Sequence, residues 1–383
     1  MMFSCPAAKP VRSGDRPEYD VIVRSFVSAE RNLKGRRFPH ALPREEAAGI
    51  GASMCAAARS CGFEVSRIGD LDPWTRSNLA ERELYSRPYL LDEEKFAALS
   101  PEAPVWLAIN DASHASPRAC RPGLELEEAW GDVSGADDAL GAAIGDAAWA
   151  FDSSLGYLMP EASFCGSGLA ARVTIHAPAL VISGLAETAF KRAMEAGFVV
   201  AGAYSSVGSS GGALFDLTLP PVYRDPERAA LSRLKAAAIA LAEYERRARE
   251  QLLSRSPWDI LDVIGRAAGR AEGARLVSRD EAADIVSGLR LGLAIGVLEG
   301  ASIEAVTDLW SSLRVRFSGA TAEGQGAEDA ASEGAPSPSA ADQALAHDSG
   351  RTRPADEPEA AMRARALRKA VAGIRFSQRY NDV

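Results

Sequence analysis

One short polar loop holds the residue types that acid–base chemistry needs. The segment N-D-A-S-H-A-S, Asn110 to Ser116, follows the apolar run Val105 to Ile109, whose composition indicates a buried strand. A histidine in such a loop can serve as a general base when a carboxylate orients it. Asp111 is the nearest carboxylate to His114 in the sequence, and the other neighbours are mainly alanine and serine. A catalytic histidine is therefore one interpretation, and a structural or solvated histidine is the favoured one.

Three other segments hold chemically capable residues, and each has a plainer interpretation. The Gly/Ser run from Ser205 to Gly212 could bind an anion through backbone amides, but it lacks the G-K-[ST] ending of a P-loop. A flexible hairpin loop is favoured there. The segment F-C-G-S-G-L, Phe164 to Leu169, does not satisfy G-x-S-x-G and indicates a tight turn entering a strand. His176 is expected in the core or at a strand end.

Composition limits the function classes. The chain has 383 residues, of which 47% are hydrophobic, and a formal net charge of -9. That charge argues against nucleic-acid binding, and no apolar run reaches the roughly 20 residues of a membrane helix. The N-terminus lacks the apolar core of a signal peptide, so we expect a cytoplasmic protein. The five cysteines form no C-x-x-C pair, so we expect free thiols and no disulfide or metal site: Cys5, Cys55, Cys61, Cys120 and Cys165.

The order of apolar patterns predicts an α+β fold followed by a helical domain. Short apolar runs outnumber helical patterns up to about residue 225 and do not alternate regularly with them. We therefore expect an N-terminal tail (1–18), an α+β domain (19–254), a helical domain (255–316), a disordered linker (317–358) and a C-terminal basic helix and tail (359–383). Helices are predicted at 43–60, from 226, and near 257–268, 279–299 and 302–313.

Four motifs, in order and nearly without gaps, carry a family resemblance. They are D-V-I-V-R-S-F-V-S-A-E-R-N-L-K-G-R-R-F-P, L-A-E-R-E-L-Y-S, V-W-L-A-I-N-D-A-S-H-A-S and L-G-Y-L-M-P-E-A-S-F-C-G-S-G-L-A-A-R-V-T-I-H-A-P-A-L-V. From about Tyr19 to Leu313 the chain resembles the bacterial protein-arginine kinases (McsB type), relatives of the phosphagen kinases. The resemblance implies a guanido-kinase domain, mainly an antiparallel sheet flanked by helices, with a C-terminal helical domain.

The chain departs from this family at the residues that do its chemistry. The family binds the triphosphate with five arginines, and other residues stand at all five positions: Phe26, Ser28, Ser116, Ala170 and Ala201. In the family motif N-E-E-D-H the second glutamate is the base, and Ala112 stands there. Asp111 replaces the first glutamate and Ser113 the aspartate, while Glu161 replaces the reactive-site cysteine and Ser206 the G-E-G acid.

The residues that survive support the architecture. They are Asn32, Arg37, Phe38, Pro39, Gly156, Tyr157, Gly166, Gly168, Leu169, Pro178, Ala179 and Leu180. Phosphoryl transfer depends on positioning and on cations around the phosphate oxygens, so these losses remove the ordinary mechanism. The leading hypothesis is a pseudokinase with no catalytic residue and no cofactor, acting as a regulatory or binding protein in arginine phosphorylation and Clp proteolysis.

An active enzyme is the alternative. Arg24, Arg118 and Arg172 each lie two residues from a vacated arginine position, and side chains at i and i+2 share a strand face. These three could form a relocated phosphate site for ATP and Mg²⁺ in a working protein-arginine kinase. The competing interpretation is that they are ordinary surface arginines.

The C-terminal region keeps part of two further family features. The motif R-D-x-x-R-A, which binds phosphoarginine in the family, is E-A-A-M-R-A here (Glu359 to Ala364) and retains Arg363. The stretch Leu289 to Gly300 follows the pattern of the family's dimerisation domain, so we expect a dimer. By resemblance, the partners would be an active arginine-kinase paralogue, its zinc-finger activator or a Clp unfoldase.

Overall fold

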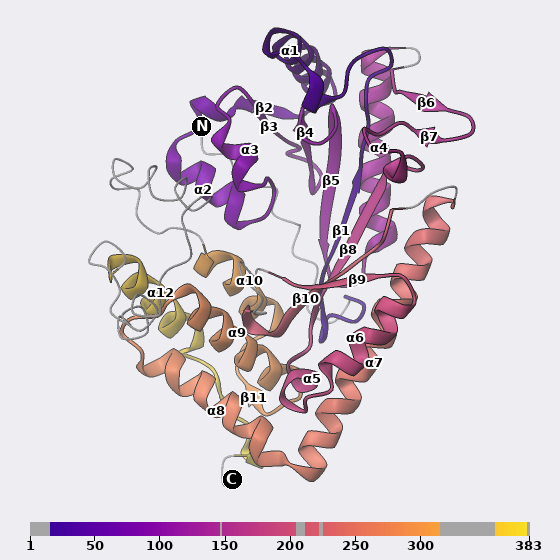
Figure 1. Ribbon diagram of the computed structural model, residues 1–383. Coiled ribbons are helices and arrows are strands. Elements are labelled where there is room, and N and C mark those ends of the chain that lie inside the picture. The colour runs from indigo at the N-terminus through magenta and orange to yellow at the C-terminus, as the bar shows by residue number, and fades with distance from the viewer. Residues whose placement is uncertain (1–15, 146–147, 204–210, 222–224, 315–356, 381–383) are drawn as a thin grey trace, which may run out of the picture.

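An eight-stranded sheet forms the centre of the molecule in a computed structural model that describes residues 16–145, 148–203, 211–221, 225–314 and 357–380 (Figure 1). Its strand order is β2-β3-β4-β5-β1-β8-β10-β9, and all neighbouring strands are antiparallel. The strands are β1 (Ile22–Ala29), β2 (Glu64–Arg67), β3 (Phe96–Leu99), β4 (Val105–Ile109), β5 (Ala115–Pro122), β8 (Leu169–His176), β9 (Val199–Gly202) and β10 (Leu214–Thr218). The predicted α+β class is confirmed.

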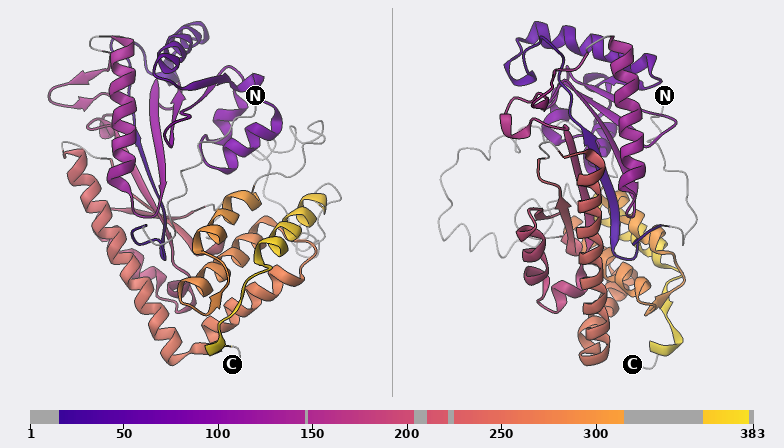
Figure 2. Two further views of the ribbon diagram at one scale, coloured as in Figure 1. Left: turned by 180° about the vertical axis from the view of Figure 1, so that it is seen from behind. Right: turned by 90° about the vertical axis from the view of Figure 1, so that its right-hand side faces the viewer.

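Long helices cover one face of this sheet. They are α1 (Arg44–Ser60), α4 (Leu126–Ile144) and α7 (Glu227–Arg255). In Figures 1 and 2, α4 and α7 run lengthwise along the sheet, and α1 lies across its upper end. Val27 of β1 is fully buried in the core that these helices share with the sheet. Because side chains alternate along a strand, Arg24, Phe26 and Ser28 project from the opposite face. That opposite face carries the candidate site.

Two short helices pack against the candidate-site face. The helices α2 (Pro73–Glu81) and α3 (Arg87–Leu91) share a second apolar core with the sheet, which includes Tyr85, Tyr89 and Trp106. Asp72 caps α2 by accepting a hydrogen bond from the backbone of Thr75. The turn between the two helices places Glu83 in the left-handed region, with φ of 57°. We call residues 73–91 the α2–α3 unit.

Four helices form the C-terminal part: α8 (Pro257–Gly273), α9 (Arg279–Ala294), α10 (Ile303–Arg314) and α12 (Glu357–Val371). The predicted helix 279–299 ends earlier, because the chain turns at Gly296, with φ of 71°, into β11 (Leu298–Glu299). Strand β11 pairs with β12 (Arg375–Phe376). The proposed linker lies almost entirely outside the described residues. The remaining elements are α5 (Pro178–Ile182), α6 (Ala186–Glu195) and the hairpin of β6 (Phe151–Asp152) and β7 (Gly156–Tyr157).

A buried arginine joins the helical region to the sheet. Arg290 of α9 is fully buried and donates to the backbone oxygens of Tyr19 and Asp20 and to Thr307. Its Nη1 lies 2.9 Å from Nδ1 of His176, whose Nε2 lies 2.8 Å from the Ser287 hydroxyl. Burial, and then the charge of Arg290, hold the pKa of His176 well below its ordinary value. His176 is therefore a neutral structural histidine.

None of the helices in the described ranges combines the length and the apolar character needed to cross a membrane. Cys55, Cys61, Cys120 and Cys165 are free thiols, as expected, and Cys5 lies outside the described residues.

Candidate functional site

Strand register brings four of the five vacated arginine positions onto adjacent strands. Ser28 of β1 pairs with Ala170 of β8 on one side and with Arg118 of β5 on the other. Phe26 pairs with Arg172 and with Cys120 in the same way. Ser116 lies two residues before Arg118 on β5. The fifth position, Ala201, is exposed on β9 and pairs with Asp216 of β10.

A carboxylate now occupies the centre of this region. Ser116 Oγ lies 2.6 Å and Ser28 Oγ 3.3 Å from Oε1 of Glu30, and the Ser113 hydroxyl donates to Oε2 of Glu30. Ser28 and Ser116 stand at vacated arginine positions, and Ser113 at the aspartate of N-E-E-D-H. Glu30 follows Ser28 by two residues, so it lies on the same face. Three hydroxyls therefore fix a negative charge where the family pattern has positive ones.

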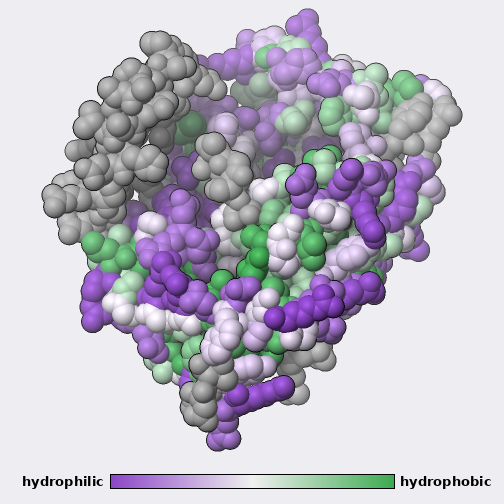
Figure 3. Space-filling model, turned by 60° about the horizontal axis from the view of Figure 1, so that its bottom comes forward, coloured by the Kyte–Doolittle hydropathy of each residue, from purple (hydrophilic) through white to green (hydrophobic). Residues whose placement is uncertain are grey.

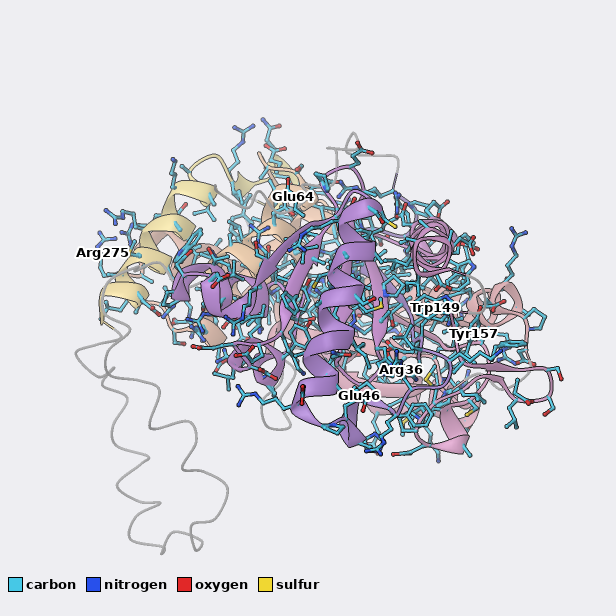
Figure 4. The ribbon with its side chains drawn as sticks, turned by 90° about the horizontal axis from the view of Figure 1, so that it is seen from above. Arg36, Glu46, Glu64, Trp149, Tyr157 and Arg275 are labelled. Carbon is cyan, nitrogen blue, oxygen red and sulfur yellow. The ribbon has the colours of Figure 1, made fainter. Side chains whose placement is uncertain are left out.

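The loop from Asn110 to His114 holds its histidine inside the protein. His114 is fully buried, and its Nδ1 lies 3.0 Å from Oδ1 of Asn32 and 3.2 Å from the backbone nitrogen of Leu33. Burial lowers its pKa, while the nearby charges of Glu46 and Arg36 act in opposite directions. Figure 4 shows Glu46 and Arg36 close together at this end of the molecule. His114 is thus part of the scaffold.

No side chain in this loop is placed as a free base. Ala112 is exposed and has only a methyl group. Asp111 Oδ2 lies 2.9 Å from Nη2 of Arg118, whose Nε donates a 3.0 Å hydrogen bond to the Ser116 hydroxyl. The carboxylate that could accept a proton is therefore neutralised by one of the three candidate phosphate-binding arginines.

The other two candidate arginines converge on Glu83. Its Oε2 lies 2.6 Å from Nη2 of Arg24 and 3.1 Å from Nη2 of Arg172. Burial acts to raise the pKa of Glu83, but the two guanidinium groups outweigh it and lower that pKa below its ordinary value. The segment L-A-E-R-E-L-Y-S resembles the family pattern L-V-E-K-H-L-I-S, in which a histidine stands at the position of Glu83. The α2–α3 unit thus places the Glu83 carboxylate against Arg24 and Arg172.

Two hydrogen bonds and a longer ion pair extend this contact into a closed ring of five side chains. Arg24 Nε donates to the Thr174 hydroxyl over 3.1 Å, and that hydroxyl donates to Asp216 over 2.5 Å. Asp216 lies 3.8 Å from Nε of Arg172, and Nη2 of Arg172 contacts Glu83, which closes the ring. Arg172 also lies over the Phe26 ring at 4.5 Å. The ring joins β1, β8 and β10 to the α2–α3 unit with two positive and two negative charges.

The charges on this face do not suit a nucleotide triphosphate. Four carboxylates, from Glu30, Glu83, Asp111 and Asp216, face three arginines, Arg24, Arg118 and Arg172. A phosphate group would have to displace an internal carboxylate from each arginine and would then lie beside it. Within the described ranges, no group of three His, Cys, Asp or Glu side chains is arranged to hold a metal ion.

The segment at the family's reactive cysteine is a surface turn. Glu161 is exposed, and Cys165 is buried with its sulfur accepting from the Met159 backbone at 3.3 Å. The turn enters β8 as predicted, through Gly168 with φ of 65°. Tyr157, which lies near Trp149 in Figure 4, packs its ring 3.5 Å from the guanidinium carbon of Arg31. Ser206 lies outside the described residues.

The retained arginine of the phosphoarginine motif is buried and engaged. Arg363 donates to the Val277 backbone oxygen at 3.0 Å and lies 3.5 Å from Glu359, with only 4% of its surface exposed. Glu359 stands at the first arginine of R-D-x-x-R-A. Here too, a carboxylate replaces an arginine and pairs with the arginine that remains.

The sequence predicted the vacated positions and the three nearby arginines but not the carboxylates that contact these arginines. Glu30 and Glu83 received no role from the sequence. Two features of the quoted motifs could have indicated these carboxylates. Glu30 lies two residues from a vacated arginine position, and Glu83 stands where the family pattern has a histidine. Only the packing of the α2–α3 unit shows that Glu83 reaches Arg24 and Arg172.

Comparisons with known proteins agree with this fold. The profile described as ATP:guanido phosphotransferase, C-terminal catalytic domain, matches residues 52–248. The protein-arginine kinase of Moorella thermoacetica is 28% identical over 313 residues, covering 79% of this chain and 88% of the relative. The protein-arginine kinase of Symbiobacterium thermophilum is 31% identical over 294 residues, covering 74% and 82%.

A solved structure has the same fold. The crystal structure of lombricine kinase is similar with a TM-score of 0.53 at 15% identity, covering 61% of this chain and 68% of that one. At this identity the likeness concerns the fold alone.

Proposed function

Because this chain belongs to the ATP:guanido phosphotransferase family, among the bacterial protein-arginine kinases, we propose that it is a member without phosphoryl-transfer activity that acts as a regulatory or binding protein. One observation carries the proposal. The Glu30 carboxylate lies within hydrogen-bond distance of hydroxyls at two vacated arginine positions. A fixed anion at this place opposes the binding of phosphate, because like charges repel, and Glu30 is held there by buried hydroxyls of Ser28 and Ser116.

The rate argument supports the same proposal. Removing one preorganised donor costs on the order of 10²–10³ in rate, and removing a general base about 10²–10⁴. These losses do not add simply, but the chain has replaced all five arginines and the base. The alternative, an active kinase with relocated arginines, would need Arg24 and Arg172 to exchange Glu83 for a phosphate.

A phosphorylation assay tests the proposal. The full chain is incubated with radiolabelled ATP, Mg²⁺ and an arginine-rich protein, and acid-labile phosphoarginine is measured beside the Moorella thermoacetica relative as positive control. We expect no signal above a reaction without protein. Phosphoarginine formed by the wild type and lost in Asp111→Asn would overturn the proposal, because that loss traces the activity to this site rather than to a contaminant.

For the regulatory role, we propose the partners that the family resemblance implies: an active arginine-kinase paralogue, its zinc-finger activator or a Clp unfoldase in the cytoplasm. Co-purification from cells with and without each partner gene distinguishes them. A partner whose arginine phosphorylation is unchanged by deletion of this chain would be excluded as its target.

A dimer is also proposed, but not through Leu289 to Gly300. Half of that stretch is buried inside the protomer, including Leu289 and Leu291, which are fully buried. The end of the molecule turned forward in Figure 3 shows an apolar area between polar ones. Exposed apolar side chains at that end include Val181 of α5, Leu185 just before α6, and Trp258 of α8, the last 64% exposed. Light scattering of the wild type and Trp258→Glu tests this, and a monomeric wild type would contradict it.

A further inference from the structure

The edge strand β2 has an open side. It is the outermost strand of the sheet, and β3 is its only partner strand in the described part of the chain. The backbone nitrogen of Ile68 donates to the oxygen of Lys95, so the next residue of β2 that is hydrogen-bonded to β3 is Ser66. Val65 and Arg67 therefore turn their N–H and C=O groups away from β3. These are the groups that a further strand would bind.

A groove of about 550 Å³ lies along this open side, and we call it the β2 groove. On one side it is lined by Arg59 of α1 and by Val65 and Phe96, which pack in the core that the sheet shares with α1. On the other side it is lined by Leu71, which lies in the turn from β2 to α2 and packs in the core of the α2–α3 unit. In the view of Figure 1, β2 lies between α1 and the α2–α3 unit. The groove therefore crosses the edge of the sheet and is bordered from both faces.

The two sides of the β2 groove carry opposite charges. Arg59 is exposed on the α1 side, and within the described ranges its guanidinium forms no ion pair. Asp70 is exposed in the turn on the other side, and its carboxylate forms no ion pair with any described residue. Two further charges of the lining are engaged, because Arg67 pairs with Glu94 and Asp72 caps α2. One basic and one acidic group thus remain for a ligand.

These charges decide which kind of strand fits. Successive side chains of an added strand point to opposite faces, so a basic residue can meet Asp70 while the adjacent acidic residue meets Arg59. A second copy of β2 does not fit. A twofold axis that pairs β2 with itself keeps each face on its own side, which would bring Glu64 of the copy to the side of Asp70 and Arg67 of the copy to the side of Arg59. Like charges would then meet on both sides.

We propose that the β2 groove binds an extended peptide segment of a partner protein as an additional strand. The segment places a basic side chain against Asp70 and the adjacent acidic side chain against Arg59, while its backbone pairs with Val65 and Arg67. In this mode of binding, backbone hydrogen bonds supply affinity and alternate side chains supply specificity. The proposal concerns the edge of the sheet and does not depend on whether the vacated face transfers phosphate.

Fluorescence anisotropy of labelled peptides with the full chain tests the groove. Acetyl-T-V-K-E-V-T-amide places its lysine and glutamate on opposite faces of a strand, and acetyl-T-V-K-V-E-T-amide has the same composition with both on one face. We expect saturable binding of the first peptide and at least about fivefold weaker binding of the second, because one charge then meets a like charge. Equal affinity of the two peptides would contradict the proposal.

N-methylated forms of the first peptide test the backbone pairing. In a strand the amides of odd and even residues point to opposite edges, so methylating one set removes the amides that face β2 and methylating the other set removes those that face solvent. We expect one of the two methylated peptides to lose binding and the other to keep it. Binding that survives in both would show that the peptide does not add as a strand.

Variants of the chain locate the binding. Asp70→Asn and Arg59→Gln should each weaken the first peptide by about threefold or more, because each loses one charge contact. Both residues are exposed, so these variants should fold as the wild type does. Asp138→Asn on α4 and Arg255→Gln at the end of α7, also exposed, are the matched controls and should bind with unchanged affinity.

Val65→Pro tests the open edge itself. It should abolish binding, because proline removes an N–H that points outward and leaves the pairing of β2 with β3 in place. Absence of saturable binding of the first peptide, or binding unchanged in both Asp70→Asn and Arg59→Gln, would overturn the proposal. A wild-type dimer that Val65→Pro dissociates in light scattering would also overturn it, because a second copy would then occupy the groove.

Discussion

The Ser116 hydroxyl donates a 2.6 Å hydrogen bond to the Glu30 carboxylate, so a residue at a former arginine position now holds an anion. Ser28 and Ser113 point their hydroxyls at the same carboxylate. Without the acids on this face, Arg24, Arg118 and Arg172 would lack the carboxylates that they contact. The additional acids make this face self-complementary, which is a stronger barrier to phosphate than the losses themselves.

Glu30→Ala should destabilise the protein. The buried hydroxyls of Ser28 and Ser116 lose their acceptor, and each unmet buried donor costs about 1–3 kcal/mol. Ser113 also loses Glu30 but keeps the backbone oxygen of Ala115 as an acceptor. Urea unfolding monitored by circular dichroism measures the change. Glu102→Ala, at an exposed loop acid, is the matched control and should lie within about 0.5 kcal/mol of the wild type. Equal stability of the two variants would mean that the serine–Glu30 cluster contributes nothing.

Glu83→Gln should create anion affinity on the vacated face. Removing this charge leaves Arg24 and Arg172 on one face of the sheet without the carboxylate that both contact. We expect millimolar pyrophosphate to raise the melting temperature of Glu83→Gln but not of the wild type. The double variant Glu83→Gln, Arg172→Gln is the control and should lose the effect. A wild type stabilised as much as the single variant would show that Glu83 does not block the arginines.

Glu83 should also make stability depend on acid pH. Its pKa is lower in the folded protein than the ordinary value of 4.5, so folding favours its charged form. The stabilisation is fully present above about pH 4.5 and is lost as pH falls through the folded pKa. The stability difference between wild type and Glu83→Gln should therefore be constant above about pH 5 and shrink below it. A constant difference down to pH 3.5 would contradict this, as urea midpoints at each pH will show.

His176 should also make the protein less stable as the pH falls, but at a higher pH than Glu83 does. Its folded pKa lies well below the unfolded value of 6.5, so the unfolded chain binds the extra proton first. Stability falls below pH 6.5, by up to about 1.4 kcal/mol per pH unit for one proton. His176→Gln should reduce this slope without abolishing it, because the pKa of His114 is lowered too. An unchanged slope between pH 6.5 and 5 would exclude His176 as a source.

Restoring the C-terminal motif should restore phosphoarginine binding. In the wild type Glu359 lies 3.5 Å from Arg363, and we expect no heat with free phosphoarginine in calorimetry. The double variant Glu359→Arg, Ala360→Asp rebuilds R-D-x-x-R-A and replaces a repelling acid with a second cation. Glu359→Gln is the control for loss of the acid alone. Binding by the wild type at micromolar concentration would refute the view that this pocket is closed.

Much of the outline was contained in the sequence. Period-two and period-3.6 apolar patterns predicted the strands and helices, because burial of one face requires them. Motif order predicted the family, and a comparison of residues predicted that Ala112, Ser116 and the other vacated positions lack the side chains of the family pattern. The shared face of Arg24, Arg118 and Arg172 also followed, since side chains two apart on a strand project the same way.

Tertiary structure alone decided what those arginines do. Glu83 lies 59 residues from Arg24 and 89 from Arg172, and a turn with φ of 57° in the α2–α3 unit brings it to both. Sequence spacing carries no information about such a meeting, because it depends on how one element packs on another. The same holds for Arg290, whose acceptors at Tyr19 and Asp20 are about 270 residues away, and for the β2 groove. The sequence determined which charges are present, and the packing determined that they neutralise one another at the vacated face.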